Sequence, residues 1–423
     1  MDSYIRSFKY DDTDGKSACI RIGYGQRFNF KENRVLYDFD QILNRKHTNS
    51  VKWEFMSLLN DKVDADALPF WIADMDFAPP PAMIEAIKKR TDQLVLGYSM
   101  ADDTYYRAVI TWFEERFTWC IAPQNIFISS GVVPAIKELL LALSAPGDGV
   151  IIQRPVYYPF SILIEKTGRR VVNNALVNTD GRYTIDFQDL EDKARDPATT
   201  MMLFCSPHNP VGRVWSREEL EQVGRICLEH DVLLVSDEIH CDLLRAGVRH
   251  FPLTTLFPDN DTIITCTSPS KTFNCAGMQI ANIIIENKIL QEKWTDMVGP
   301  ELPSPLALAA VRGAYEGGGA WLQQLRKYLD DNVLFLQHFL RTELPETRFT
   351  VPEGTYLAWI DFSSYGYSNR ELSDLLVTGA RVLLEDGLMF GSEGNGFQRM
   401  NIACPRSILK TGLQQMAATL HPG

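Results

Sequence analysis

Residues 200–240 read TMMLFCSPHNPVGRVWSREELEQVGRICLEHDVLLVSDEIH and decide the fold. Two short apolar runs, TMMLFC and DVLLVS, enclose a helical pattern. Ser216 and Glu219 form an S-x-x-E capping box that marks the start of this helix. Apolar residues then recur at helical spacing, at Leu220, Val223, Ile226 and Cys227. The stretch therefore predicts a strand, a helix and a second strand.

The same alternation extends outward from about residue 125 to 290. The further apolar runs are NIFIS, GVIIQ, TIITC and QIANIII. Runs of this kind, apolar at consecutive positions, suit a sheet that is covered on both faces. Strands that alternate with helices predict an α/β sandwich with a mostly parallel sheet.

The pattern changes after about residue 310. Helical stretches such as LDDNVLFLQHFL and RELSDLLVTGARVLL flank the strand-like TYLAWIDF and FQRMNIA, which indicates a second, smaller α/β domain. Residues 1–35 show no sustained periodicity, and we interpret them as an N-terminal extension. A length of 423 residues agrees with two or three domains.

Composition excludes several classes of protein. The chain is 45% hydrophobic and carries a formal net charge of -12, so it is of ordinary globular type and disfavours nucleic acid and anionic membranes as partners. No run approaches the length of a membrane helix. The first residues are charged throughout and lack an apolar signal segment, so we expect a cytoplasmic protein.

The eight cysteines are scattered and never form C-x-x-C, so we expect buried free thiols rather than disulfides or a zinc site. The acidic run around Asp237, with Glu238, His240 and Asp242, is the other candidate for a metal. Adjacent residues of a strand point to opposite faces, so we expect no metal there.

Polar residues follow five of the predicted strands, where ligands bind in open α/β sheets. Gly131 opens a helix after NIFIS, and exposed amides at a helix start form an anion site. The other strand-end segments are RPVYYPF, SPHNP, DEIH and SPSK. Together these segments supply an anion-binding helix start for a phosphate, aromatic rings, an amide, a carboxylate and a lysine. Pyridoxal phosphate needs each of these groups, so the sequence predicts this cofactor.

The chain resembles fold-type I pyridoxal-phosphate enzymes, in particular the MalY/PatB-like cystathionine beta-lyase and cystalysin family of C–S lyases. The resemblance runs from about residue 37 to the C-terminus. It is carried, in order, by PFWIADMDFAPP, LGYSM, GVVPAIKE, PVYYPF, LFCSPHNPVGRVW, SDEIHCDL, SPSKTFNCAGM, EGTYLAWIDF and FQRMNIACPRS.

The resemblance implies an aminotransferase class I/II-like fold: a large domain with a mostly parallel seven-stranded sheet between helices, and a smaller α/β C-terminal domain. We expect residues 36–75 to pack with the small domain, residues 76–310 to form the large cofactor-binding domain, and residues 311–423 to form the small domain. The extension has no counterpart in the family.

The resemblance also implies catalytic roles for Lys271, Asp237 and Tyr157. Lys271 is similar to the lysine that forms a Schiff base with the cofactor and moves protons. Asp237 corresponds to the partner of the ring nitrogen, and Tyr157 to the residue that stacks on the ring. Asn209 is expected to donate to the ring phenolate.

For the cofactor phosphate, the resemblance implies the amides of Gly131 and Val132 and the hydroxyls of Ser268 and Ser270. Tyr98 is expected to reach the phosphate of a neighbouring subunit, which implies a homodimer with shared active sites.

For the substrate, Arg399 is similar to the arginine that holds the α-carboxylate, although a structural salt bridge is the alternative. Tyr158 either contributes a hydroxyl to the substrate site or only packs. Asp74 lies in the 71–77 stretch, which shapes the substrate entrance or belongs to the core.

Two positions depart from the aminotransferase pattern. His240 stands where aminotransferases usually have a tyrosine, and Gln279 stands where they have an arginine. The lyase branch shares the histidine, so we expect His240 beside the cofactor, with an unreactive core histidine as the alternative. The resemblance thus implies a C–S lyase that takes a small sulfur amino acid such as cystathionine, cysteine or a cysteine S-conjugate. An aminotransferase and a largely non-catalytic, cofactor-binding regulator remain as alternatives.

Overall fold

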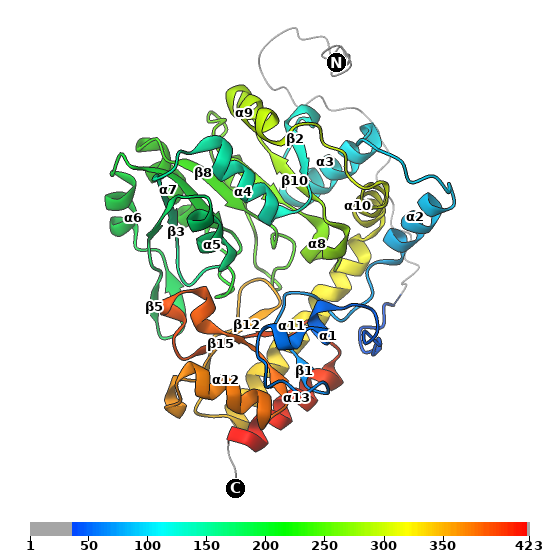
Figure 1. Cartoon of the computed structure of the whole chain (residues 1–423), viewed down its shortest axis with the longest axis vertical. Helices are drawn as coiled ribbons and strands as arrows, with labels where there is room; N and C mark the ends of the chain where they lie inside the picture. Colours follow the sequence, from blue (N-terminus) through cyan, green and yellow to red (C-terminus); the bar gives the residue numbers. More distant parts are fainter. Residues whose placement is uncertain (1–35, 421–423) are drawn as a thin grey trace. The chain divides into compact units, whose positions relative to one another are not determined.

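A computed structural model describes residues 36–420 of the chain, so the predicted extension lies outside the described residues. Its central feature is a seven-stranded sheet (Figure 1). In spatial order the strands are β2 (Ile126–Ser129), β10 (Ala281–Ile284), β9 (Ile264–Thr267), β8 (Leu233–Asp237), β7 (Thr199–Cys205), β3 (Gly149–Ile152) and β4 (Arg170–Asn173). All neighbours run parallel except β10, which is antiparallel to β2 and β9. The predicted mostly parallel sheet is confirmed.

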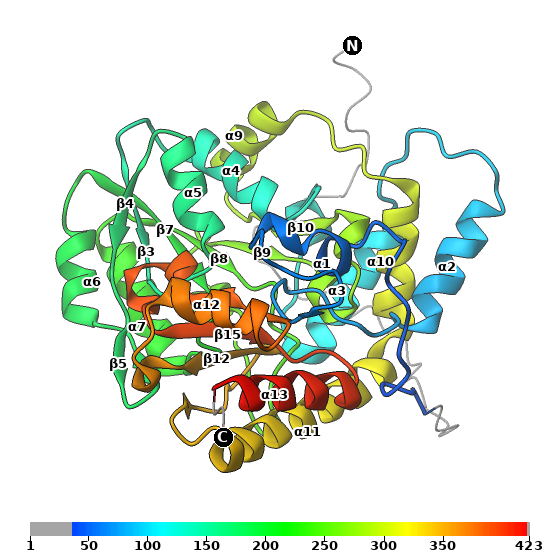
Figure 2. The ribbon, with the colours of Figure 1, turned by 60° about the horizontal axis from the view of Figure 1, so that its bottom comes forward.

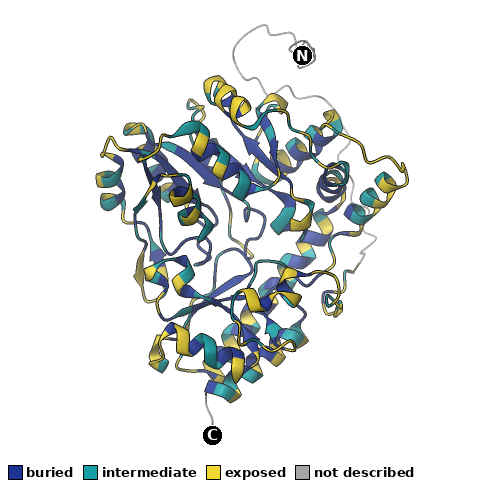
Figure 3. Ribbon diagram, viewed as in Figure 1, coloured by how far each residue is buried: buried dark blue, intermediate teal, exposed yellow. Residues whose placement is uncertain are grey.

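Helices cover both faces of this sheet because its strands are apolar at successive positions. In β3, Val150 and Ile152 belong to one buried cluster and Ile151 to another. The first cluster includes side chains of α4 (Val132–Leu143), α5 (Pro159–Lys166) and α9 (Lys288–Val298). The second includes α6 (Phe187–Ala194) and α7 (Arg217–Glu229). Figure 3 shows the strands as the buried layer between these helices.

Helix α7 begins as the sequence predicts. Both hydrogen bonds of the capping box between Ser216 and Glu219 are present. The remaining helices of this half are α2 (Pro81–Thr91), α3 (Asp103–Phe117), α10 (Pro305–Gly317) and the short α8 (Pro269–Thr272), and a hairpin joins β5 (Val177–Thr179) to β6 (Arg182–Thr184).

A smaller antiparallel sheet forms the C-terminal part. It consists of β11 (Arg348–Phe349), β12 (Leu357–Asp361), β15 (Phe397–Asn401) and β14 (Glu385–Asp386), in that order. Its helices are α11 (Gly319–Glu343), α12 (Asn369–Thr378) and α13 (Arg406–Leu420). Figure 2 shows α11 and α13 lying side by side beneath this sheet.

The segment before the large sheet also contacts this smaller part. After the short helix α1 (Val51–Glu54), strand β1 (Leu68–Pro69) pairs in parallel with β13 (Val382–Leu383). The Phe70 ring packs against Gly412 of α13, where an added Cβ would come within 2.5 Å of it. Residues 68–70 therefore have packing partners far away in the sequence, and the predicted domain boundaries stay a prediction.

Six cysteines are buried free thiols, as expected: Cys205, Cys227, Cys241, Cys266, Cys275 and Cys404. Cys120 is disulfide-bonded, so the expectation of a free thiol is wrong there. Cys19 lies outside the described residues. Among residues 36–420, no helix has the length and apolar character needed to cross a bilayer.

Candidate active site

Asp237 ends the central strand β8, at the carboxyl edge of the sheet. It lies between Cys205 of β7 and Cys266 of β9 in register. The side chain is buried, and Oδ1 accepts a hydrogen bond of 3.1 Å from the Ile239 amide. Burial raises the pKa of Asp237 to about 7, and the neighbouring charge of Glu238 acts in the same direction. The positive charge of Lys271 lowers this pKa, so a further cationic partner would favour the ionised carboxylate at neutral pH.

Lys271 lies on α8, the short helix that follows β9. Ser268 caps this helix by accepting from the Ser270 amide at 3.1 Å. The Lys271 amine donates to the carbonyl of Ala73 at 2.8 Å. Burial lowers the pKa of Lys271, and so does the positive charge of Arg399, whereas Asp74 and Asp237 raise it. These effects favour the neutral amine, the form that reacts with an aldehyde.

Arg399 lies in β15 and is 2% exposed. Its Nη1 donates to Asn209 Oδ1 at 2.9 Å, and its Nη2 donates to the Trp71 carbonyl at 3.2 Å and to the Glu385 carboxylate. The guanidinium carbon lies 4.8 Å from the centroid of the Phe390 ring. Arg399 therefore joins the small sheet to the loop after β7, where Asn209 lies.

Two tyrosines stand at the start of α5, next to this arginine. The ring centroids of Tyr157 and Tyr158 are 5.6 Å apart. Burial raises the pKa of both phenols, while the charge of Arg399 lowers it. Asp237 also acts on Tyr157, so this ring lies within electrostatic reach of both the acid and the arginine.

His240 is buried, and its Nδ1 has no hydrogen-bond partner in the part of the chain that the structure describes. Its ring meets Tyr356 edge-on at 6.1 Å. Burial, together with the charges of Lys271 and Arg399, lowers the pKa of His240 to about 3. The imidazole is therefore neutral at pH 7, and Nδ1 is available to another group.

The expected phosphate ligands occupy two helix starts. Gly131 precedes α4 with a φ of 156°, a conformation that L side chains rarely adopt. Val132 is the first residue of that helix and is buried. At α8, the Ser268 hydroxyl already donates to the Ile280 carbonyl at 2.7 Å, so a phosphate oxygen would compete with that carbonyl.

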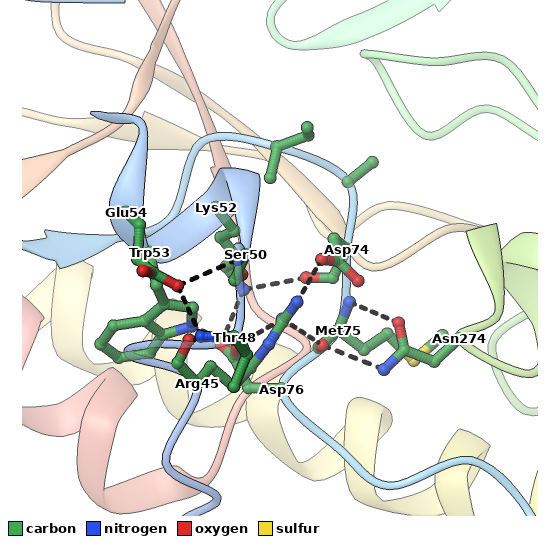
Figure 4. Close-up of polar contacts among 12 residues, drawn as sticks. Arg45, Thr48, Ser50, Lys52, Trp53, Glu54, Asp74, Met75, Asp76 and Asn274 are labelled. Atoms are coloured by element: carbon green, nitrogen blue, oxygen red, sulfur yellow. Dashed lines mark hydrogen bonds and ion pairs between the residues drawn. The ribbon is translucent and has the colours of Figure 1, made fainter. Parts of the chain in front are cut away.

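Asp74 lies at the edge of the cluster, with 28% of its side chain exposed. Arg45 donates to its carboxylate at 2.6 Å and to Asp76 at 3.0 Å. The buried Lys52 donates to Asp76 at 2.6 Å and to the Asp74 carbonyl at 2.9 Å. Figure 4 shows these side chains converging on the 74–76 stretch, with Asn274 bonded to Met75 from the other side.

Tyr98 does not join the cluster. Its side chain is 95% exposed on the segment between α2 and α3. The same segment exposes Leu94, Val95, Leu96 and Met100. A surface hollow there is lined by residues 96–98 and 302–306. Within the described chain, Tyr98 is thus exposed to solvent rather than buried with the other expected site residues.

The residues fit pyridoxal phosphate. Two buried nitrogens without partners in the described part of the chain, His240 Nδ1 and Arg399 Nε, belong to the same cluster as Lys271 and Asp237. Lys271 supplies an amine of lowered pKa, and Asp237 supplies a buried carboxyl group of raised pKa. Gly131 precedes helix α4, whose first amides have no partner within the helix. This chemistry matches what the ring, aldehyde and phosphate of the cofactor need.

Sequence reasoning missed several groups that contact the expected site residues. Glu385 lies on the two-residue strand β14, too short to show a periodic pattern. The Ala73 carbonyl, which accepts from Lys271 and from Tyr356, is a main-chain atom and carries no sequence signal. Lys52 and Arg45 lie in a segment with few regular elements; a lysine flanked by valine and tryptophan was the only signal.

Most of the chain is similar to known proteins. The model of the family described as aminotransferase class I and II matches residues 66–415. Cystathionine beta-lyase PatB of Bacillus subtilis is 42% identical over 90% of this chain and 100% of its own length. Protein MalY of Escherichia coli is 34% identical over 89% of this chain and 97% of its own length.

Solved structures agree with these relatives. Cystalysin from Treponema denticola, whose structure contains pyridoxal 5'-phosphate, is 38% identical with a TM-score of 0.88, and the match covers 91% of this chain and 99% of that one. A PLP-bound C–S lyase from Staphylococcus hominis is 38% identical with a TM-score of 0.87, and the match covers 92% and 99%.

Proposed function

Since this chain belongs to the aminotransferase class I and II family, we propose that it is a pyridoxal-phosphate-dependent C–S lyase. The observation that carries the proposal is that Lys271 lies within electrostatic reach of both Asp237 and Arg399, two residues that are buried. The names of its similar relatives, a cystathionine beta-lyase and PLP-bound C–S lyases, support the same reaction class.

The cofactor, when bound, supplies a ring that withdraws electrons from the substrate Cα. Lys271 would hold its aldehyde carbon, Asp237 its ring nitrogen, Asn209 its phenolate oxygen and the amides at the start of α4 its phosphate. Tyr157 would lie against its ring. Substrate binding, proton transfer and the exclusion of water are carried out by the side chains of the protein.

Arg399 binds the α-carboxylate of the amino acid and fixes the position of Cα. The Lys271 amine takes the proton from Cα, and its lowered pKa makes the neutral, basic form of the amine more available. His240 is neutral, and its buried Nδ1 is available for a hydrogen bond with a polar group. The buried side chains around these groups keep bulk water away from the proton in transit.

The balanced reaction is an α,β-elimination. The Cα–H and Cβ–S bonds break, the thiolate leaves with the bonding electrons and takes up a proton, and water then releases pyruvate and ammonia. We propose cystathionine, cysteine or a cysteine S-conjugate as the substrate, because each carries an α-carboxylate for Arg399 and a sulfur at Cβ.

A substrate panel tests the proposal. Purified holoenzyme is incubated with cystathionine, cysteine and S-alkylcysteines, and pyruvate and thiol are measured without any oxo acid. We expect equal amounts of both products, and no turnover by Lys271→Ala. Product that forms only after addition of an oxo acid would favour an aminotransferase, and cofactor binding without any product would favour a regulator.

We also propose a homodimer in which Tyr98 of each subunit serves the site of its partner. Its support is the exposed apolar segment around Tyr98, because single-chain proteins rarely expose a contiguous apolar patch without a partner. Analytical ultracentrifugation should give twice the mass of the chain. A monomer at micromolar concentration would contradict this.

A further inference from the structure

The arginine proposed to bind substrate already has a buried acidic partner. Arg399 and Glu385 are 2% and 3% exposed, and Nη2 of the arginine donates to Oε2 of the glutamate. The two residues face each other across the β14–β15 ladder, where Glu385 is paired with Arg399. The backbone register therefore fixes this ion pair.

Further contacts hold the guanidinium in a single orientation. Asn209 accepts from Nη1 at 2.9 Å, the Trp71 carbonyl accepts from Nη2 at 3.2 Å, and the Phe390 ring lies beneath the guanidinium carbon at 4.8 Å. Nε is buried and has no partner in the described part of the chain. The arginine thus keeps one N–H free for a ligand while its charge is already balanced.

Charge balance is what makes Glu385 important here. A buried guanidinium without a counter-ion is strongly disfavoured, so removal of its carboxylate leaves a cation that any anionic ligand stabilises. Burial raises the pKa of Glu385, and the charges of Arg399 and Lys271 lower it. Tyr157 and Tyr158 also face this carboxylate, and its charge raises the pKa of both phenols.

We propose that Glu385 is a positioning residue that holds Arg399 in place and, by sharing its charge, sets how tightly the α-carboxylate of the substrate binds. This inference rests on the proposed role of Arg399 in carboxylate binding. Glu385 does not touch the reacting atoms. It lowers affinity for the carboxylate of substrate and product alike, which favours release.

The test compares two small ligands that cannot react with the cofactor, propionate and propionamide. They have nearly the same shape and differ in charge. Their dissociation constants are obtained for the holoenzyme from the rise of Tm with ligand concentration at constant ionic strength. In Glu385→Gln we expect propionate to bind roughly tenfold more tightly, about the effect of freeing one charged hydrogen bond for the ligand, and propionamide to be unchanged.

The matched control is Asp330→Asn. Asp330 is the partner of another buried arginine, Arg245, at 2.8 Å, and lies on α11. This variant also loses the acidic partner of a buried arginine, yet we expect its propionate affinity to equal that of the unaltered protein. If both variants bound propionate more tightly by the same factor, the cause would be the change in net charge of the protein, and the proposal would be overturned.

Turnover gives a second readout. With a lyase substrate, Glu385→Gln should lower KM by a similar factor and change kcat less than threefold, because the glutamine still accepts a hydrogen bond. A loss of kcat at unchanged KM, or unaltered propionate binding, would reduce Glu385 to a structural residue. Should Glu385→Gln not fold, Glu385→Asp withdraws the carboxylate by one methylene and must tighten propionate binding measurably, or the proposal fails.

The two proposals fail in different ways. A protein that releases no pyruvate from any substrate contradicts the lyase proposal, but its propionate affinity still reports on Glu385. A true lyase whose Glu385→Gln variant binds propionate as before contradicts only the inference about Glu385.

Discussion

The charge state of single residues governs this site. Asp237 is buried, and its pKa is raised to about 7. The folded chain therefore holds the proton more tightly than the unfolded chain does, where an aspartate ionises near pH 4. The stability from the protonated form is fully present below that pH and is lost as the pH rises through 7.

This predicts a pH dependence for the cofactor-free protein. Its free energy of unfolding should fall by about 1–4 kcal/mol between pH 4 and pH 8, and Asp237→Asn should remove much of that fall. Urea denaturation across this range measures it. Glu301, whose pKa is also raised to about 7, keeps part of the slope in both proteins. If the free energy of unfolding fell equally with pH in the unaltered protein and in Asp237→Asn, Asp237 would not be the source of the pH dependence.

At the scale of elements, helix α4 depends on its glycine cap. Gly131 has a φ of 156°, and a Cβ added there would lie 3.4 Å from the Pro134 ring. Gly131→Ala should strain the start of the helix, because an alanine in this backbone conformation costs about 1–3 kcal/mol. We therefore expect cofactor binding to weaken about tenfold. Equilibrium dialysis measures the affinity.

The control for this variant is Gly147→Ala. Gly147 also has a positive φ, 91°, but a Cβ there meets nothing within 4 Å. It lies in the loop between α4 and β3, at the other end of the helix. We expect an unchanged cofactor affinity. Equal losses in both variants would exclude a specific role for the start of α4.

The segment around α1 supports the 72–77 stretch through buried charges. Lys52 is fully buried and binds Asp76 at 2.6 Å. Lys52→Met should lower the free energy of unfolding by about 3 kcal/mol, because it breaks a buried ion pair from one side. Lys46→Met, which removes an exposed pair with Asp66, should cost less than about 1 kcal/mol. Urea denaturation compares the two, and equal losses would contradict the importance of burial.

At the scale of the whole molecule, the proposed sharing of sites between subunits predicts complementation. In the proposed homodimer, Lys271→Ala and Tyr98→Ala each impair turnover. A hybrid of the two contains one site with both native residues. Mixing the variants under conditions that exchange subunits should therefore restore part of the pyruvate release. Activity no higher than the average of the two parents would mean that each chain completes its own site.

The five interior strands of the large sheet, its edge strand β2 and the capped helix α7 were predictable, because continuous apolar runs and a capping box are local signals. The edge strand β4 was not, since its residues are exposed or only partly buried and it lacks an apolar run. The family resemblance anticipated Lys271, Asp237, Asn209 and Arg399 as site residues, and the structure brings them together. It gave no hint of Glu385 or Lys52, whose partners are set by tertiary pairing rather than by sequence spacing.

One contact has an evolutionary consequence. The amine of Lys271 rests on the carbonyl of Ala73, an atom that every amino acid possesses. Point mutation at position 73 cannot delete this acceptor; only a change in the course of the main chain can move it. Natural variation in the reactivity of the lysine should therefore arise less at position 73 itself than at side chains that hold the main chain beside it, such as Arg45 and Asn274.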